Sequence, residues 1–350
     1  MAQPTARKLS LVIRYLMLSG CIVGIACFVV YMVYLHHTWH FPRHAGDVIQ
    51  EVEPVSAMSP RALTAWALDT RVLRPAAYYF FGLQSAIRRL GNPVRPFFRG
   101  ALVEASSRSY FPVLYLIKEP LALHLLTLVA LLFALWRLHA PLIRRGWLRD
   151  HFTEFAFLLT LLLYWGVSIR SPLKLGVRHV LPTFPFVFIL VGAGLAAVAD
   201  RLRTRTAAWS IAVAVTVLLT WQAATVIRVH PSYLAYFNEL AGGPDGGLEW
   251  AGDSNLDWGQ DLKRLAEFVN EHEIQTIHLD YFGSAVPGQY LRGKEQRIQR
   301  CTAPQRGWVA VSAFWYQKSR AKPECDYRRW LTKERFVTKI GYSILVFRVD

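Results

Sequence analysis

Long apolar runs constrain this chain more than any other feature, because a helix that spans a bilayer needs about 20 mostly apolar residues. Five such runs lie at residues 11–35, 121–136, 155–169, 180–199 and 209–226. Some are shorter than a full span, so we expect their helices to extend into flanking residues. The pattern predicts a polytopic α-helical membrane protein with about five transmembrane helices.

The basic residues predict how these helices are oriented. Arg7, Lys8 and Arg14 precede or begin the first run, and lysine and arginine near a span favour the cytoplasmic side. The run is too long for a signal-peptide core, and no small-residue cleavage site follows it. We therefore expect a cytoplasmic N-terminus in an inner (plasma) membrane. The loops after the second and fourth runs are also basic and belong on the cytoplasmic side (Arg137, Arg144, Arg145, Arg149; Arg201, Arg203, Arg205).

This orientation divides the chain into four parts. They are a cytoplasmic N-terminus with the first helix (1–35), an extracytoplasmic loop with interfacial helices (36–120), four transmembrane helices (121–226) and an extracytoplasmic α/β domain (227–350). In the loop, residues 75–90 show helical amphipathicity, which fits either a helix in the membrane interface or an ordinary docked helix. In the last part, β-branched and aromatic residues predict strands at 274–281, 308–316 and 336–349.

The net charge of +16 suggests nucleic acid as one candidate partner. Only 18% of the residues are charged. However, the arginines lie mostly at the ends of apolar runs and not in one polar block. This distribution fits anionic lipid headgroups and control of topology. We therefore expect membrane lipid and no nucleic acid as a partner.

A polar segment at residues 252–261, called here the 252–261 segment, follows the last apolar run. We predict that Asp257 caps the helix that follows, with Gln260 at its third helical position. Asp253 and Asn255 are expected to form Asx turns. Direct substrate contact by these four side chains is the alternative.

The spacing of Asp253, Asn255 and Asp257 resembles the start of a calcium loop, but Trp258 and Arg264 stand where that loop needs glycine and an acid. An EF-hand is therefore excluded. No metal site and no cofactor are predicted, although a looser divalent-cation site with oxygen ligands remains an alternative.

The cysteines do not form a disulfide framework. Cys21 and Cys27 lie inside the first apolar run, where cysteine behaves as a small apolar residue. Cys301 and Cys325 can pair if their domain is extracytoplasmic. The sequence leaves this pairing open.

The short outward loop at 170–179 carries Arg170, Lys174 and Arg178, which is unusual for an outward loop under the charge rule. Arg178 is able to bind a lipid phosphate with two parallel hydrogen bonds. The alternative is a simple interfacial anchor. The excess of positive charge in this loop points towards function.

Several blocks together resemble one family. They are residues 109–120 (SYFPVLYLIKEP), 176–182 (GVRHVLP), 230–244 (HPSYLAYFNELAGGP), 253–261 (DSNLDWGQD) and 340–344 (IGYSI). In order and spacing they are similar to the C-terminal half of bacterial family 39 glycosyltransferases, the protein mannosyltransferase-like group with a GT-C fold. The resemblance covers most of the chain from about residue 75 onward.

The resemblance implies an enzyme that takes a sugar from a polyprenyl-phosphate carrier on the outer face of the membrane. It suggests Arg178, His179 and Lys118 as contacts to the donor phosphate. In the family, the catalytic acids lie in the first outward loop, which has no counterpart here, so the catalytic residues are unknown. Asp47, Glu51 and Glu53 are acidic and outward, but their setting does not match that motif.

The missing counterpart of the first outward loop leaves two possible functions. The chain is a shortened glycosyltransferase homologue that works with a partner membrane subunit carrying the front half, or it is a non-catalytic membrane binding or assembly protein derived from the family. A transporter has less support, because the apolar runs show no array of buried charges.

Overall fold

The computed structural model describes residues 3–39, 66–91, 95–104, 106–138, 147–202, 204–301 and 304–350. The chain divides into two compact units, Met1–Asn92 and Pro93–Asp350. Each is described by itself.

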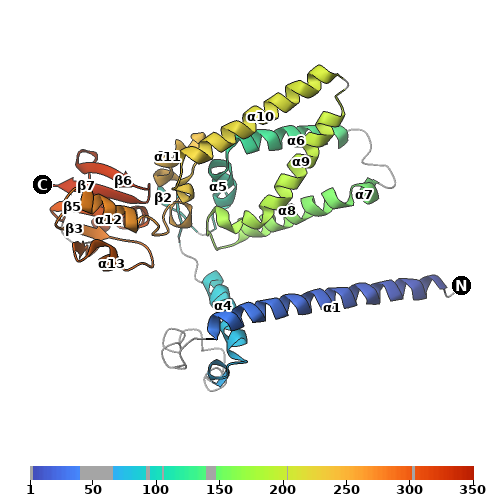
Figure 1. The fold of residues 1–350 in the computed structure, drawn as a ribbon, viewed down its shortest axis with the longest axis horizontal. Coiled ribbons are helices and arrows are strands. Elements are labelled where there is room, and N and C mark those ends of the chain that lie inside the picture. The colour runs from blue at the N-terminus through green and yellow to red at the C-terminus, as the bar shows by residue number, and fades with distance from the viewer. Residues whose placement is uncertain are drawn as a thin grey trace. The chain divides into compact units, whose positions relative to one another are not determined.

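The described part of the first unit includes the long helices α1 (Gln3–Thr38) and α4 (Arg74–Gly91) (Figure 1). They contact each other, and the rings of Tyr34 and Tyr79 meet edge to face with centroids 5.9 Å apart. The side chain of Tyr31 on α1 donates a hydrogen bond to the carbonyl of Val72, just before α4. The predicted amphipathic helix at 75–90 is therefore confirmed as α4, whereas its place in a membrane interface stays a prediction.

Long apolar helices make up much of the second unit. They are α6 (Leu121–Leu138), α8 (Phe152–Arg170), α9 (Phe184–Asp200) and α10 (Arg205–Arg228). A four-residue helix, α7 (Trp147–Asp150), precedes α8. The close contact between α6 and α9 depends on small residues, because a Cβ at Gly194 would lie 2.7 Å from the Cβ of Ala130.

Across both units, four described helices are long and apolar enough to cross a membrane: Leu9–Thr38, Phe152–Arg170, Leu181–Asp200 and Arg205–Arg228. A fifth candidate is a pair bent by 110°, Tyr110–Lys118 with Leu121–Arg137. All five apolar runs are thus confirmed as mainly helical. Four of the helices extend beyond their runs, whereas α9 begins at Phe184, after a 3-10 turn at Leu181–Thr183, and ends one residue beyond the run at 180–199. The run at 121–136 reaches spanning length only together with the short helix α5 (Tyr110–Lys118) before it.

A mixed five-stranded sheet forms the C-terminal part of the second unit. Its strands are β3 (Ile277–Asp280), β4 (Glu295–Arg297), β5 (Gly307–Ser312), β6 (Phe336–Ile340) and β7 (Ile344–Val349), in the order β4-β3-β5-β7-β6. Strand β3 is parallel to β4 and β5, whereas β7 is antiparallel to β5 and β6. The helices α12 (Leu262–Glu271) and α13 (Pro287–Leu291) pack on one face.

Two predicted strands differ from the observed ones. The stretch 308–316 is strand only to Ser312, and the helix α14 (Ala313–Lys318) follows. The stretch 336–349 is a hairpin of two strands, because Gly341 and Tyr342 adopt positive φ angles of 56° and 69° and reverse the chain. Aromatic and β-branched residues run through both stretches, so composition alone does not separate strand from turn or helix.

A separate core joins the long helices to the sheet. It includes residues from α5, from the chain before α9, and from the stretch that contains the short helix α11 (Gly243–Trp250). Its fully buried members include Phe111, Leu114, Val180, Ala235 and Leu256. Figure 1 shows α5, α11 and the small hairpin of β1 (Phe97–Phe98) and β2 (Ala101–Leu102) between the long helices and the sheet. This core positions the candidate site.

Candidate functional site

The 170–179 loop and the 252–261 segment pack directly against each other. The side-chain oxygen of Asn255 accepts a hydrogen bond from the backbone N–H of Val177 (3.1 Å), and Ser254 donates to the carbonyl of Leu175 (2.7 Å). Gly176 permits this approach, because its φ is 87° and a Cβ there would lie 2.4 Å from Asn255. Two of the five sequence blocks that carry the family resemblance, 176–182 and 253–261, are therefore in direct contact.

Helix α5 closes this junction from a third direction. Tyr110 donates to the carbonyl of Lys174 and accepts from the amide of Asn255. Lys118 is buried, and its ammonium donates to the carbonyls of Leu234 and Asn255, each at 2.8 Å. An ammonium has three N–H donors. Lys118 therefore has a structural role, and one N–H of its ammonium is left for a further acceptor. The contact of Lys118 with a donor phosphate stays a prediction.

Asp257 does not cap the helix after it. Helix α12 begins at Leu262, and Asp261 occupies the cap position without a side-chain cap hydrogen bond. The fully buried carboxylate of Asp257 accepts from the N–H of Gly259 and from the N–H of Phe314 at the start of α14. Burial outweighs these two hydrogen bonds and raises the pKa of Asp257 to about 7. Asp257 therefore ties the 252–261 segment to the sheet.

The other three predicted residues of the segment differ in what they contact. Gln260 accepts from the N–H of Trp258 and donates to the carbonyl of Leu256, so it stabilises the local turn and not a helix start. Asp253 has a φ of 53° and accepts from the N–H of the next residue, Ser254. An Asx turn needs the N–H two residues on, so the expected Asx turn at Asp253 is wrong. Asn255 instead reaches across to the 170–179 loop, so the expected Asx turn at Asn255 is wrong.

Arg178 and His179 lie at the same junction but differ in exposure. The guanidinium of Arg178 is exposed, donates through Nε to the carbonyl of Leu175 and lies 4.7 Å from the ring centroid of Trp258. The imidazole of His179 stacks on Phe111 with centroids 5.1 Å apart. Burial, and then the charge of Lys174, lower the pKa of His179, which keeps it neutral near pH 7.

Sequence reasoning missed several residues of this region. Asn238 is buried and its amide donates to the carbonyls of Leu116 and Glu119 at the end of α5. At the end of β3, Asp280 accepts from Arg300 and from Tyr327. No local pattern identifies these residues, because each contacts a partner far away in the sequence.

The cysteine pairing that the sequence left open is present. Cys301 and Cys325 form a disulfide, whereas Cys21 and Cys27 are free and exposed on α1. The bond joins the residues next to Arg300 and near Tyr327, so it holds both partners of Asp280 together. A disulfide is typical of an oxidising compartment.

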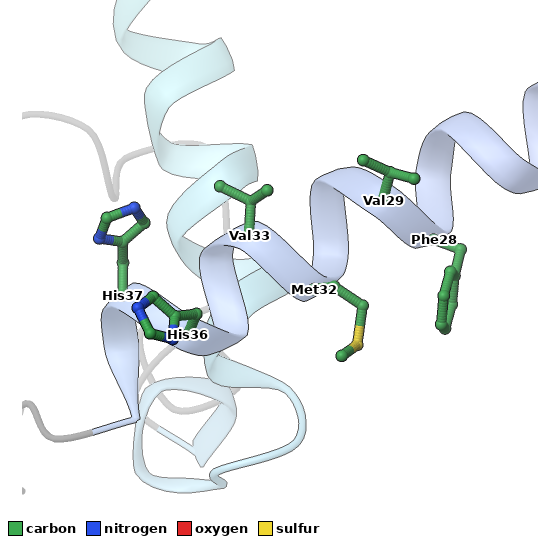
Figure 2. A pocket seen from close by; sticks show the side chains of 6 residues that line it. All are labelled: Phe28, Val29, Met32, Val33, His36 and His37. Carbon is green, nitrogen blue, oxygen red and sulfur yellow. The ribbon is translucent and has the colours of Figure 1, made fainter.

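A hollow elsewhere in the first unit offers no candidate chemistry. It lies on the last turns of α1 and, among the described residues, is lined by side chains of that helix, as Figure 2 shows (Phe28, Val29, Met32, Val33, His36, His37). Within the described part of the chain, no three His, Cys, Asp or Glu side chains come together to hold a metal ion. Asp47, Glu51 and Glu53 lie outside the described residues.

Compared with models of known families, with curated proteins and with solved structures, the chain matches none of them. The resemblance to family 39 therefore remains an interpretation of the sequence blocks.

Proposed function

We propose that the chain is the back half of a membrane glycosyltransferase with a GT-C-like architecture, which uses a polyprenyl-phosphate-linked sugar. In this proposal the long apolar helices cross an inner membrane, and the sheet domain faces outward. A partner membrane subunit carrying the front half supplies the catalytic base. This chain contributes contacts to the donor phosphate.

The observation that carries the proposal is the setting of Arg178. This exposed guanidinium lies three residues before the apolar stretch Leu181–Asp200, so it stands at the headgroup level if that stretch crosses a bilayer. Among the described residues no carboxylate pairs with it, and its Nε bond to Leu175 leaves both terminal nitrogens for a ligand. A guanidinium suits a phosphate, because its planar fork binds two oxygens at once.

The transfer that we propose has a simple balance. The oxygen of an acceptor hydroxyl forms a bond to the anomeric carbon of the sugar, and the bond from that carbon to the phosphate oxygen breaks. The hydroxyl proton goes to the partner's base, and the electron pair leaves with the polyprenyl phosphate. Arg178 stabilises the negative charge that grows on this phosphate. The lowered pKa of His179 favours its neutral form, so its imidazole adds no positive charge to the phosphate site.

One observation favours the second function, a non-catalytic binding or assembly protein. Three buried polar side chains of the junction, Lys118, Asn255 and Asp257, each bind backbone groups of the same chain. An assembly protein needs this rigid junction without any chemistry.

Transfer of labelled sugar from a polyprenyl-phosphate donor tests the proposal. The chain is co-expressed with a multi-span protein from a neighbouring reading frame that carries an outward Asp-Glu pair after its first helix. We expect transfer that Arg178→Ala lowers about a hundredfold, the effect of removing one donor that stabilises developing charge. Arg170→Ala is the matched control, because Arg170 is also exposed and bound to a backbone carbonyl at this end of α8.

If no combination of the chain and a partner transfers sugar while both proteins are folded, the enzymatic function is refuted and the assembly protein is the remaining proposal. Equal transfer by Arg178→Ala and Arg170→Ala would remove Arg178 from the donor site.

A further inference from the structure

The one aromatic side chain of the 252–261 segment, that of Trp258, is exposed on a hydrogen-bonded backbone. Trp258 is 52% exposed, although Leu256 and Asp257 beside it are fully buried. Its backbone N–H donates to Gln260, and the next residue, Gly259, accepts a hydrogen bond from Tyr281. The exposure of the indole is thus built into a fixed backbone and does not come from a loose loop.

Gly259 makes this presentation of Trp258 sterically possible. Its φ is 79°, and a Cβ there would lie 2.6 Å from the Cα of Gly283 and 2.7 Å from the carbonyl oxygen of Phe282. The loop therefore packs backbone against backbone on the chain that leaves β3. This close packing holds the backbone beside the exposed indole, whereas Ser254, Asn255, Leu256 and Asp257 before it are buried.

Trp258 is the outer member of an aromatic cluster at the carboxyl ends of the parallel strands β3 and β5. It meets the ring of Phe282 at 75° with centroids 5.9 Å apart, and Phe282 stacks on Phe314 at 3.9 Å. The carboxyl ends of parallel strands are where open α/β sheets commonly bind ligands. The cluster supports the indole from the side of the sheet.

The guanidinium of Arg178, which comes from the 170–179 loop and not from the sheet, also lies near the indole of Trp258. It is 4.7 Å from the indole centroid, and its terminal nitrogens have no acceptor among the described residues. An exposed aromatic surface next to a cation without a carboxylate partner matches one ligand chemistry, a ring with an apolar face that carries a phosphate. A sugar linked to a phosphate has this chemistry, because its C–H groups form apolar patches.

We propose that Trp258 is a specificity-determining residue that stacks on the sugar ring of the donor while Arg178 binds the phosphate of the same molecule. This inference rests on the proposed function and adds the residue that distinguishes a sugar-bearing lipid from the bare carrier. The two contacts are adjacent, as the sugar and phosphate are adjacent in the donor.

Equilibrium binding to the full chain in lipid nanodiscs tests the inference. The probes are polyprenyl phosphate and the same lipid carrying mannose, glucose or galactose. We expect wild type to bind one sugar-bearing lipid more tightly than the bare carrier. Trp258→Ala should weaken that binding about tenfold and leave the bare carrier unchanged, because one aromatic contact is worth about a factor of ten.

The controls separate stacking from stability and from anchoring. Trp258→Phe retains an aromatic face and should keep most of the preference. Tyr290→Ala removes another exposed aromatic ring of the same domain and should change neither affinity. Arg178→Ala should weaken both lipids equally, because they share the phosphate.

The outcomes that overturn the inference differ from those that overturn the function. If Trp258→Ala weakens both lipids equally or neither, or if wild type prefers no sugar-bearing lipid, Trp258 is at most an interfacial anchor and the donor-phosphate role of Arg178 stands. If no probe binds and Arg178→Ala changes nothing, the proposed function fails together with the inference.

Discussion

The side-chain oxygen of Asn255 accepts a hydrogen bond from the backbone N–H of Val177, which lies 78 residues earlier in the chain. Asn255 is buried, and its amide nitrogen is also used, on Tyr110 and on the carbonyl of Gly252. One side chain therefore connects α5, the 170–179 loop and the 252–261 segment. The position of Arg178 depends on this connection, because Arg178 follows Val177 directly.

Replacing Asn255 with alanine should release the 170–179 loop. The substitution leaves the N–H of Val177 without its acceptor, and an unsatisfied buried polar group costs about 1–3 kcal/mol. We expect faster hydrogen exchange at residues 176–179 and a lower thermal midpoint of the full chain. Asn270→Ala is the control, because Asn270 is exposed on α12 and its side chain accepts a hydrogen bond from the exposed ammonium of Lys294. Unchanged exchange at Val177 in Asn255→Ala would refute the connecting role.

Lys118 provides a second test of the same junction. Its ammonium satisfies the carbonyls of Leu234 and Asn255, so Lys118→Met keeps most of the volume but leaves both carbonyls without a donor. We expect a loss of about 2 kcal/mol or more in unfolding free energy, measured in detergent without added polyprenyl lipid. Lys322→Ala, at an exposed position, should have no effect. If Lys118→Met retains full stability but binds the lipid donor less tightly, its role is phosphate binding and not packing.

The success and failure of the sequence-based predictions have a common physical reason. The apolar runs predicted the long helices, because an extended run of apolar residues carries its structural signal within itself. The prediction that Asp257 caps a helix is wrong, because a carboxylate is equally suited to capping a helix and to accepting a hydrogen bond from a distant backbone N–H. The choice between them depends on the N–H of Phe314, which is 57 residues away.

The candidate site shows the same limit. The loop with Arg178 and the segment with Trp258 were each recognisable as unusual stretches of sequence. That they form one surface depends on Gly176, whose missing Cβ lets Asn255 approach. A contact of this kind leaves no periodic or compositional pattern in the sequence from which it could be predicted.

The disulfide makes a prediction about cysteine reactivity. Cys301 and Cys325 are bonded, whereas Cys21 and Cys27 are free. A maleimide added to the denatured, non-reduced chain should therefore label two cysteines, and four after reduction. The double variant with serine at positions 301 and 325 should lose about 3 kcal/mol of unfolding free energy, the value expected for a closed loop of this length. Four labelled cysteines before reduction would show that the bond does not form in the cell.

Asp257 predicts how stability depends on pH. Burial raises its pKa in the folded chain to about 7, above the ordinary value of 3.8. Between these two values the folded state binds more protons than the unfolded state, so stability falls as pH rises through this window and levels off above it. Asp261 has a pKa that burial also raises, although Ser343 and Arg264 oppose the shift, and it adds to the same trend.

The variant Asp257→Asn isolates the contribution of Asp257. Asparagine does not titrate, so the decline in thermal midpoint between pH 4 and pH 7 should become shallower. At pH 5, where the raised pKa keeps Asp257 protonated, the variant should be close to wild type in stability, because a protonated carboxyl and an amide each keep one carbonyl oxygen as acceptor for the N–H groups of Gly259 and Phe314. Thermal unfolding of the full chain in nanodiscs at a series of pH values measures both effects. An identical pH dependence in the two proteins would mean that Asp257 stays ionised in the fold, held by its two backbone N–H donors.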